Sequence, residues 1–357
     1  MVYLLKKLVC ILAIITTLFT IAGCTDNKSN QVVQQEYVSK TDFYLDTVVD
    51  IKIYNPNNKS AEVIDKAMKR IGALEKILSI HIEGSDLWNI KKNAGIKPVE
   101  VSKETMEVMK ASLRYSEYTN GLFDITTGPL VDLWAINPPN GYVPTEEELQ
   151  TSLSKINYNN MIIDEENNTI LLKDKGMIAN LGAIAKGYIA DEVKEILVEN
   201  DVKSAIINLG GNVLLVGGKP DNSGFKIGVQ DPNSDRGAYL GVIDARDLSV
   251  VSSGDYERYF EVEGKKYHHI LNPATGYPAD NEIRQVTILS KLSVDGDGLS
   301  TSAFLLGLKG GIELIENIDG IEAIFITKDN KIYLTSGMRD TFVFDQANYG
   351  DQYTVVK

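Results

Sequence analysis

The N-terminal 24 residues constrain the rest of this chain more than any other stretch. Lys6 and Lys7 precede an apolar run over residues 8–22, and small residues then lead to Cys24. A positive start, a short apolar run and small residues before a cysteine are typical of a bacterial lipoprotein signal peptide. The alternative, an uncleaved transmembrane anchor, requires about 20 apolar residues and is disfavoured by this shorter run. We therefore expect residues 1–23 to be removed and Cys24 to carry lipid.

This interpretation sets the compartment and excludes several kinds of site. Cys10 lies in the apolar run and Cys24 is the expected lipidation site, so the mature domain would contain no thiol. A disulfide framework, a cysteine-ligated zinc site and a cysteine nucleophile are then excluded. Residues 24–39 are mostly polar, which predicts a flexible tether. A folded domain over residues 40–357 would lie outside the cytoplasm, held at the cell membrane by its lipid.

The charge of the chain limits its partners. Its 36 Lys and Arg residues against 49 Asp and Glu residues give a formal net charge of −13. Loss of two lysines with the signal peptide would make this −15, because neither Asp nor Glu occurs in residues 1–23. An acidic protein does not suit nucleic acid, so we expect no such partner. A phosphate-bearing ligand would need a cation beside it.

Hydrophobic periodicity predicts both helices and strands. Alternating apolar residues over 44–54 indicate a half-buried strand, and helical spacing over 60–79 indicates an amphipathic helix. A second helix is expected over 103–119. We expect one strand over 239–251, then a turn at 252–254 and a hairpin that follows it. The fold class predicted is α+β, with mixed β-sheets flanked by helices, as one unit or as two closely joined subdomains.

Three stretches contain residues suited to a binding site. Residues 121–139 are too irregular for one element and too apolar for a solvated loop, so we expect them to line a site. Residues 177–197 form a glycine-containing turn that opens into a helix, which suits either phosphate binding or close packing. Residues 252–278 include the adjacent histidines His268 and His269. His81, alone in its segment, is compatible with a structural or a functional role.

The stretch over residues 295–304 has two interpretations. Its sequence, DGDGLSTSAF, predicts a loop that leads into a helix ending near Gly307. Asp, Ser and Thr are preferred at helix N-caps, so the cluster could serve only as a cap. Carboxylate and hydroxyl oxygens one turn apart would also suit Mg²⁺, which prefers oxygen ligands.

The glycine-containing stretch over residues 204–218 matches neither a Walker loop nor GxGxxG, so P-loop and Rossmann folds have no support.

Six motifs in order resemble the FAD:protein FMN transferase (ApbE) family across nearly all of the mature chain. They are GLFDITTGPLVDLW (121–134), NLGAIAKGYIAD (180–191), INLGGNV (207–213), SSGDYERYF (252–260), HHILNPATGYP (268–278) and DGLSTSAFLLG (297–307). The resemblance implies an ApbE-like fold and a Mg²⁺-dependent reaction. In that reaction the FMN half of FAD is transferred to a threonine hydroxyl of an acceptor protein, and AMP is released.

The resemblance also implies roles for individual residues. Mg²⁺ would be held by Asp297, Thr301 and the backbone carbonyl of Ala183, with Ser300 close by. Contacts to FAD would come from Leu45, His81, Leu122, Phe123, Asp124, Asn180, Lys186 and Ile270, with His268 and His269 beside the pyrophosphate. A threonine hydroxyl needs activation by a base or a metal. His268, His269 and Asp297 are the candidates, with His268 the first choice.

The chain departs from the family pattern at several positions. Leu45-Asp46-Thr47 stands where the family usually has Met-Gly-Thr, which adds a carboxylate. The acceptor motif begins Asp-Gly-x-Ser/Thr, and residues 297–300 match only this beginning, so a separate acceptor protein is expected. Two other functions remain open: an FAD pyrophosphatase that passes FMN to water, and a flavin-binding lipoprotein without catalytic activity.

Overall fold

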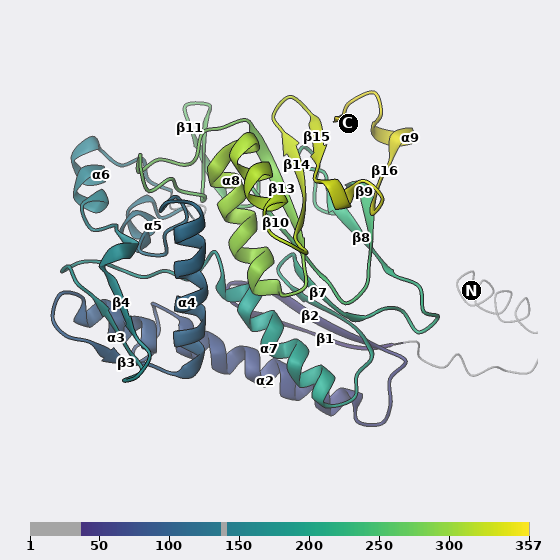
Figure 1. Ribbon diagram of the computed structural model, residues 1–357, viewed down its shortest axis with the longest axis horizontal. Coiled ribbons are helices and arrows are strands. Elements are labelled where there is room, and N and C mark those ends of the chain that lie inside the picture. Colours follow the sequence, from purple (N-terminus) through teal and green to yellow (C-terminus); the bar gives the residue numbers. More distant parts are fainter. Residues whose placement is uncertain (1–36, 137–140, 357) are drawn as a thin grey trace, which may run out of the picture. The chain divides into compact units, whose positions relative to one another are not determined.

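A nine-stranded β-sheet forms the centre of the fold (Figure 1). The computed structural model describes residues 37–136 and 141–356, which form one compact unit rather than two subdomains. The predicted signal peptide, Cys24 and most of the tether lie outside these residues. Neighbouring strands are antiparallel except for the last pair. Their order is β1 (Tyr37–Tyr44), β2 (Thr47–Tyr54), β6 (Ser204–Leu209), β7 (Asn212–Gly217), β10 (Ser249–Gly254), β13 (Ile283–Ser290), β14 (Glu322–Thr327), β15 (Lys331–Leu334) and β17 (Thr354–Val356).

Three long helices cover one face of this sheet (Figure 1). They are α2 (Ser60–Leu78), α7 (Ala185–Glu199) and α8 (Ser293–Glu316). The buried residues of α2 recur every three or four positions, from Val63 to Leu78, which gives the helix one apolar side. This side packs on Val49, Ile51 and Ile53 of β2. Helix α8 is interrupted at Gly307, whose backbone is not helical, close to the predicted helix end.

A smaller sheet covers part of the opposite face. It consists of β16 (Phe342–Phe344), β9 (Tyr239–Ala245) and β8 (Phe225–Gln230), in that order. Its apolar residues form a second core with Leu215, Val250 and Leu289 of the main sheet. The main sheet is therefore covered on both faces in this region, which explains why β13 is buried along nearly its whole length.

Most of the remaining elements lie at one end of the layer of long helices (Figure 1), whereas the short C-terminal helix lies beside the small sheet, where Tyr349 packs on the second core. The remaining elements are α3 (Asp86–Asn93), α4 (Lys103–Tyr118), α5 (Gly128–Trp134), α6 (Glu146–Leu153), the sheet of β3 (Val99–Glu100), β5 (Thr169–Leu172) and β4 (Met161–Asp164), the hairpin of β11 (Tyr259–Val262) and β12 (Lys265–His268), and the C-terminal helix α9 (Gln346–Tyr349). Trp134 and Leu271 join α5, α6 and the segment after β12 in a third small core.

The α+β prediction is confirmed, and three local predictions are wrong. Residues 239–251 form two strands in different sheets, because the chain turns at Asp247, which has a left-handed backbone (φ 52°). Residues 252–254 are not a turn but the end of β10, where they pair with β13. Residues 295–304 are not a loop, because α8 already begins at Ser293. Strand β1 also starts within the segment predicted as a tether.

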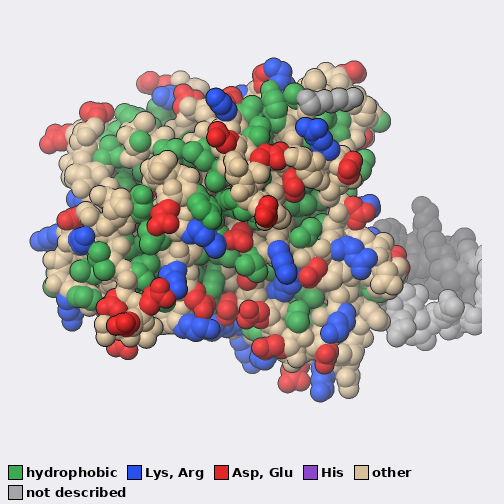
Figure 2. Space-filling view, in the orientation of Figure 1, with side chains coloured by type: hydrophobic (Ala, Val, Ile, Leu, Met, Phe, Trp, Pro, Cys, Tyr) green, Lys and Arg blue, Asp and Glu red, His purple; other side chains and the backbone are tan. Residues whose placement is uncertain are grey.

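The surface is of mixed charge. On the face shown in Figure 2, acidic and basic side chains are interspersed, with hydrophobic side chains between them. Of the helices within residues 37–136 and 141–356, none is both long and apolar enough to cross a membrane.

Candidate active site

A pocket of about 1450 Å³ lies between the turn that joins β1 to β2, the loop before α5, the start of α7 and the segments around β11 and β12. Pockets for drug-sized ligands measure roughly 300–1000 Å³, so this one has room for a larger ligand or for two reactants. Twelve of the residues singled out in the sequence line it: Leu45, His81, Leu122, Phe123, Asp124, Asn180, Ala183, Lys186, His269, Ile270, Asp297 and Thr301. Two do not, His268 and Ser300.

Asp297 joins two helices at the pocket floor. It is the fifth residue of α8, so it does not cap its own helix. Its Oδ2 instead accepts a hydrogen bond of 2.9 Å from the backbone N–H of Gly187, in the first turn of α7. Its Oδ1 lies 3.4 Å from the Nζ of Lys186. The side chain is only 5% exposed, and the helix N-terminus and the lysine together stabilise its charge.

Asp191 of α7 makes the corresponding interaction with the start of α8. The two carboxylate oxygens of Asp191 accept hydrogen bonds from the backbone N–H groups of Ser293 (2.8 Å) and Val294 (2.9 Å), at the start of α8. Each helix thus supplies a carboxylate to the first turn of the other. The close crossing requires glycine at 187, since a Cβ there would lie 2.3 Å from the carbonyl oxygen of Ser293. Gly187 therefore serves packing between helices.

Thr301 lies one turn beyond Asp297 and brings a hydroxyl to the pocket. Ser253 of β10, which also lines the pocket, holds it in place, with its Oγ 3.3 Å from the Oγ1 of Thr301 and 2.8 Å from the Oγ of Ser300. Ser300 is fully buried and donates to the backbone carbonyl of Asp297. Thr301 is therefore the hydroxyl available to a ligand, and Ser300 supports it. The sequence did not indicate Ser253 because that residue was expected in a turn.

The oxygen atoms around Asp297 fit a hard cation. A carboxylate, the Thr301 hydroxyl and a backbone carbonyl are ligands that Mg²⁺ accepts. Within residues 37–136 and 141–356, no backbone N–H donates to the carbonyl of Ala183, so this oxygen has lone pairs to offer. Nowhere in the described chain do three or more His, Cys, Asp and Glu side chains gather to hold a metal. A cation here would be held by the oxygen atoms of Asp297, Thr301 and the Ala183 carbonyl, together with phosphate oxygens of a ligand.

The two adjacent histidines have different surroundings. Both ring nitrogens of His268 face backbone groups: Nε2 lies 2.9 Å from the carbonyl oxygen of Ala279, and Nδ1 accepts from the N–H of Ile270. Burial lowers the pKa of this ring, which packs against Phe304. His268 does not line the pocket. The structure therefore does not support His268 as the base, because its side chain points into the core.

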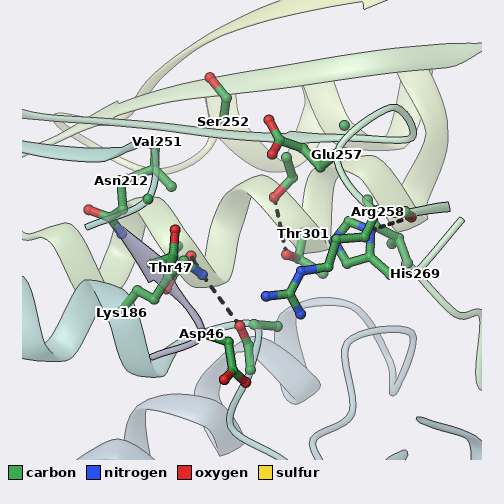
Figure 3. A pocket seen from close by; sticks show the side chains of 18 of the residues that line it. Asp46, Thr47, Lys186, Asn212, Val251, Ser252, Glu257, Arg258, His269 and Thr301 are labelled. Carbon is green, nitrogen blue, oxygen red and sulfur yellow. Dashed lines mark hydrogen bonds and ion pairs between the residues drawn. The ribbon is translucent and has the colours of Figure 1, made fainter. Parts of the chain in front are cut away.

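His269 lines the pocket in its place (Figure 3). Its Nδ1 lies 3.2 Å from the backbone carbonyl oxygen of Arg258, which can only accept, so Nδ1 carries the proton. This leaves the lone pair on Nε2. Burial, together with the charge of Arg258, lowers the pKa of His269 to about 3. The ring is therefore neutral near pH 7 and keeps the lone pair on Nε2.

The turn between β1 and β2 brings an apolar side chain to the pocket. Leu45 and Asp46 both have left-handed backbones (φ 55° and 56°), as a two-residue type I′ hairpin requires. The N–H of Leu45 donates to the Oε1 of Glu75 in α2, which holds the turn in place. Gly210 lies so near that a Cβ there would be 2.3 Å from the Oγ1 of Thr47.

Asp124 and Asn180 line the pocket but use their side chains locally. The carboxylate of Asp124 accepts from the N–H and hydroxyl of Thr126 and from the N–H of Tyr158. Burial raises the pKa of Asp124, while these bonds oppose that shift. The Oδ1 of Asn180 accepts from the N–H of Gly182. Both residues therefore shape the loops that form the pocket wall.

Asn212 and Arg258 are among the pocket residues that the sequence did not single out. Asn212 is 2% exposed, its Oδ1 accepts from the Oγ of Ser293, and its Nδ2 has no partner among the described residues. Arg258 extends its guanidinium into the pocket (Figure 3). Both lie within the motifs recognised in the sequence, but single-sequence spacing does not show which motif residues face a cavity.

Known proteins resemble this chain over most of its length. The model of the ApbE family matches residues 45–325. The chain is 37% identical to an FAD:protein FMN transferase of Klebsiella pneumoniae over 82% of this chain and 90% of the relative. It is 30% identical to one of Treponema pallidum, over 86% and 88% of the two chains.

Solved structures agree with the sequence comparisons. The ApbE protein of Thermotoga maritima aligns with a TM-score of 0.78 at 31% identity, over 85% of this chain and 99% of its own. The flavin transferase ApbE of Vibrio cholerae aligns with a TM-score of 0.77 at 27% identity, over 86% and 99%. Together with the shared motifs, these matches show that the chain belongs to the ApbE family.

Proposed function

We propose that this protein transfers the FMN half of FAD to a threonine hydroxyl of a separate acceptor protein and releases AMP, with Mg²⁺ bound at Asp297 and Thr301. As a family member the chain is a transferase, similar to relatives named FAD:protein FMN transferase. The observation that carries the proposal is that one pocket combines Asp297, Lys186 and Thr301 with the neutral ring of His269.

The pocket suits each part of the substrate. Leu45, Leu122 and Phe123 offer apolar surface for a flat flavin ring. The ammonium group of Lys186 lies beside Asp297, where it can pair with phosphate oxygens. Bound Mg²⁺ would be held by Asp297, Thr301 and the carbonyl of Ala183, and it would neutralise charge on the pyrophosphate. Without a cation, the carboxylate of Asp297 and the pyrophosphate would repel each other.

The proposed transfer needs one proton acceptor, and His269 supplies it. The Nε2 of His269 takes the proton of the acceptor threonine, whose oxygen forms a bond to the flavin-side phosphorus. The bond from that phosphorus to the bridging oxygen breaks, and AMP leaves with this oxygen. The hydrogen bond from Nδ1 to the Arg258 carbonyl holds the ring and its tautomer in place. Lys186 can stabilise the charge that develops on the phosphate oxygens.

One experiment separates the proposed function from the two alternatives. The purified protein is mixed with FAD, Mg²⁺ and a peptide that carries the whole acceptor motif, Asp-Gly-x-Ser/Thr followed by Gly or Ala, a small residue and Thr. The products are identified by mass spectrometry. A peptide that gains one FMN, with an equal amount of AMP, supports transfer. Free FMN and AMP without modified peptide would indicate a pyrophosphatase, and intact FAD would indicate a binding protein. Either of these results contradicts the proposal.

A further inference from the structure

Five cationic side chains line the pocket, and four of them are paired with carboxylates. The pairs are Lys186–Asp297 (3.4 Å), Arg236–Glu257 (3.2 Å), Lys266–Asp255 (3.5 Å) and Arg284–Asp255 (2.8 Å). Arg258 is the exception. Across residues 37–136 and 141–356, its guanidinium has neither an ion pair within 4.0 Å nor a hydrogen bond to another group.

The position of Arg258 is set by the backbone rather than by its side chain. It lies in the loop between β10 and β11, and its carbonyl oxygen accepts from both the N–H (3.0 Å) and the Nδ1 (3.2 Å) of His269. Arg258 and His269 are thus held together at one wall. Figure 3 shows the Arg258 side chain extending from this wall toward the centre of the pocket, past the ring of His269.

An unpaired guanidinium in the pocket of a protein with a net charge of −13 indicates an anionic ligand. Arginine stays charged and presents a planar fork of donors that matches phosphate oxygens. We infer that Arg258 binds phosphate oxygens of the nucleotide substrate from the His269 side of the pocket that Asp297 and Thr301 also line. This rests on the proposed function only for the identity of that nucleotide as FAD.

A carboxylate of the acceptor protein is the competing ligand for this guanidinium. Phosphate is favoured because the backbone carbonyl of Arg258 is hydrogen-bonded to His269, the candidate base. The phosphoryl group under attack must lie beside that base. Arginine in this place would both hold the phosphate and stabilise the charge that develops on it during transfer.

The test compares ligands with and without phosphate, and it needs no turnover. Binding of ADP and of riboflavin to the full-length protein in detergent with Mg²⁺ is measured by calorimetry. The variants are Arg258→Gln, Arg258→Lys and, as a matched control, Arg236→Gln, whose side chain lines the same pocket but pairs with Glu257 and is 82% exposed. We expect Arg258→Gln to weaken ADP binding about tenfold or more and to leave riboflavin binding unchanged.

The controls distinguish a phosphate contact from general damage. Arg258→Lys should lose less ADP affinity than Arg258→Gln, since it keeps the charge but not the fork, and Arg236→Gln should bind both ligands as the wild type does. Unchanged ADP affinity in Arg258→Gln would overturn the inference, and weaker binding of the acceptor peptide alone would assign the side chain to the acceptor. An equal loss for riboflavin would also overturn it. If the wild type bound ADP but transferred no FMN, the proposed function would fail while this comparison still stood.

Discussion

In His269 and in Asp297, one side-chain atom forms a hydrogen bond to the backbone and a second atom remains for a ligand. His269 donates from Nδ1 to the Arg258 carbonyl and keeps the lone pair of Nε2. Asp297 accepts from the Gly187 N–H at Oδ2, while Oδ1 lies toward Lys186. In both cases the first interaction fixes the orientation of the side chain, so the remaining atom is already directed before substrate binds.

The two neighbouring histidines should respond differently to substitution. His269→Ala is expected to lower kcat by about 10²–10⁴, the usual contribution of a general base. His268→Gln should keep a rate near that of the wild type, because His268 does not line the pocket. It should lower the free energy of unfolding by about 1–3 kcal/mol, since a Gln side chain cannot keep both the hydrogen bond to the Ala279 carbonyl and the packing of the ring against Phe304. Rates and chemical denaturation of both variants measure this, and the reverse order of kcat would contradict the assignment.

The pH dependence of transfer should reflect the low pKa of His269. Because burial lowers that pKa to about 3, the ring is already neutral at pH 5 and remains so at higher pH. The rate should therefore show no inflection near pH 6.5, where an ordinary histidine loses its proton. A rate profile from pH 5 to pH 8 at saturating FAD and Mg²⁺ measures this. An inflection near 6.5 that disappears in His269→Ala would show that the pKa is not lowered.

Replacing the carboxylate of Asp297 should impair metal binding more than folding. Asp297→Asn keeps an oxygen that can accept from the Gly187 N–H but removes the negative charge that attracts Mg²⁺. The Mg²⁺ concentration for half-maximal transfer should rise about tenfold or more. The control is Asp295→Asn, two residues earlier in α8, whose carboxylate pairs with Arg114 and does not line the pocket. Equal Mg²⁺ dependence in the two variants would argue against the proposed site.

At the scale of elements, α7 and α8 are joined by exchanged carboxylates. Asp191 of α7 accepts at the first turn of α8, and Asp297 of α8 accepts at the first turn of α7. Neither helix has a side-chain cap of its own. Because four N–H groups at each helix start need partners, the exchange stabilises both helices and fixes their crossing. The pocket floor is therefore rigid at Asp297.

The stability of this crossing should depend on pH through Asp191. Burial raises the pKa of Asp191 to about 6, from 3.8 for the ordinary side chain. The folded state then binds more protons than the unfolded state, so this contribution is fully present below pH 4 and is lost as pH rises through 6. Relative to Asp191→Asn, the wild type should lose roughly 3 kcal/mol of unfolding free energy between pH 4 and pH 7. Urea denaturation at several pH values measures this, and parallel curves would contradict it.

At the scale of the whole molecule, the pocket gathers segments that are far apart in the chain. Leu45, Asp124, Ala183, Arg258 and Asp297 come from five different segments, and all of them line it. The walls of the pocket come from the turn between β1 and β2, the starts of α7 and α8, and the loops around β11. Loops and helix ends held by a rigid sheet commonly carry the functional residues of a protein.

The proposed membrane attachment is a separate property of the N-terminal segment. We propose that the cell adds lipid to Cys24, as the pattern of residues 6–24 indicates. Cys24→Ser should then abolish incorporation of labelled palmitate in cells. The chain offers a matched control, since Cys10 is its only other cysteine, and Cys10→Ser should label as the wild type does. Labelling that persists in Cys24→Ser would contradict the proposal.

Much of the fold could be predicted from local patterns. The helix of residues 60–78 and the strand of residues 47–54 follow from the spacing of their apolar side chains. The break between β9 and β10 could not, because residues 239–251 read as one apolar strand until the left-handed Asp247 divides them between two sheets. The start of α8 was also missed, because its first turn is capped by Asp191, which lies about a hundred residues away.

The sequence by itself determined the family, the fold class and most residues of the pocket, because ordered motifs and apolar periodicity are local properties of the chain. The tertiary structure decided which motif residues face the cavity. It placed His268 in the core and His269 at the pocket, and it placed Asp297 in a helix rather than in a loop. Among the residues that the structure describes, it gave Arg258 no carboxylate partner. These outcomes depend on hydrogen bonds to distant backbone groups such as those of Ala279, Arg258 and Gly187, and sequence spacing does not record such contacts.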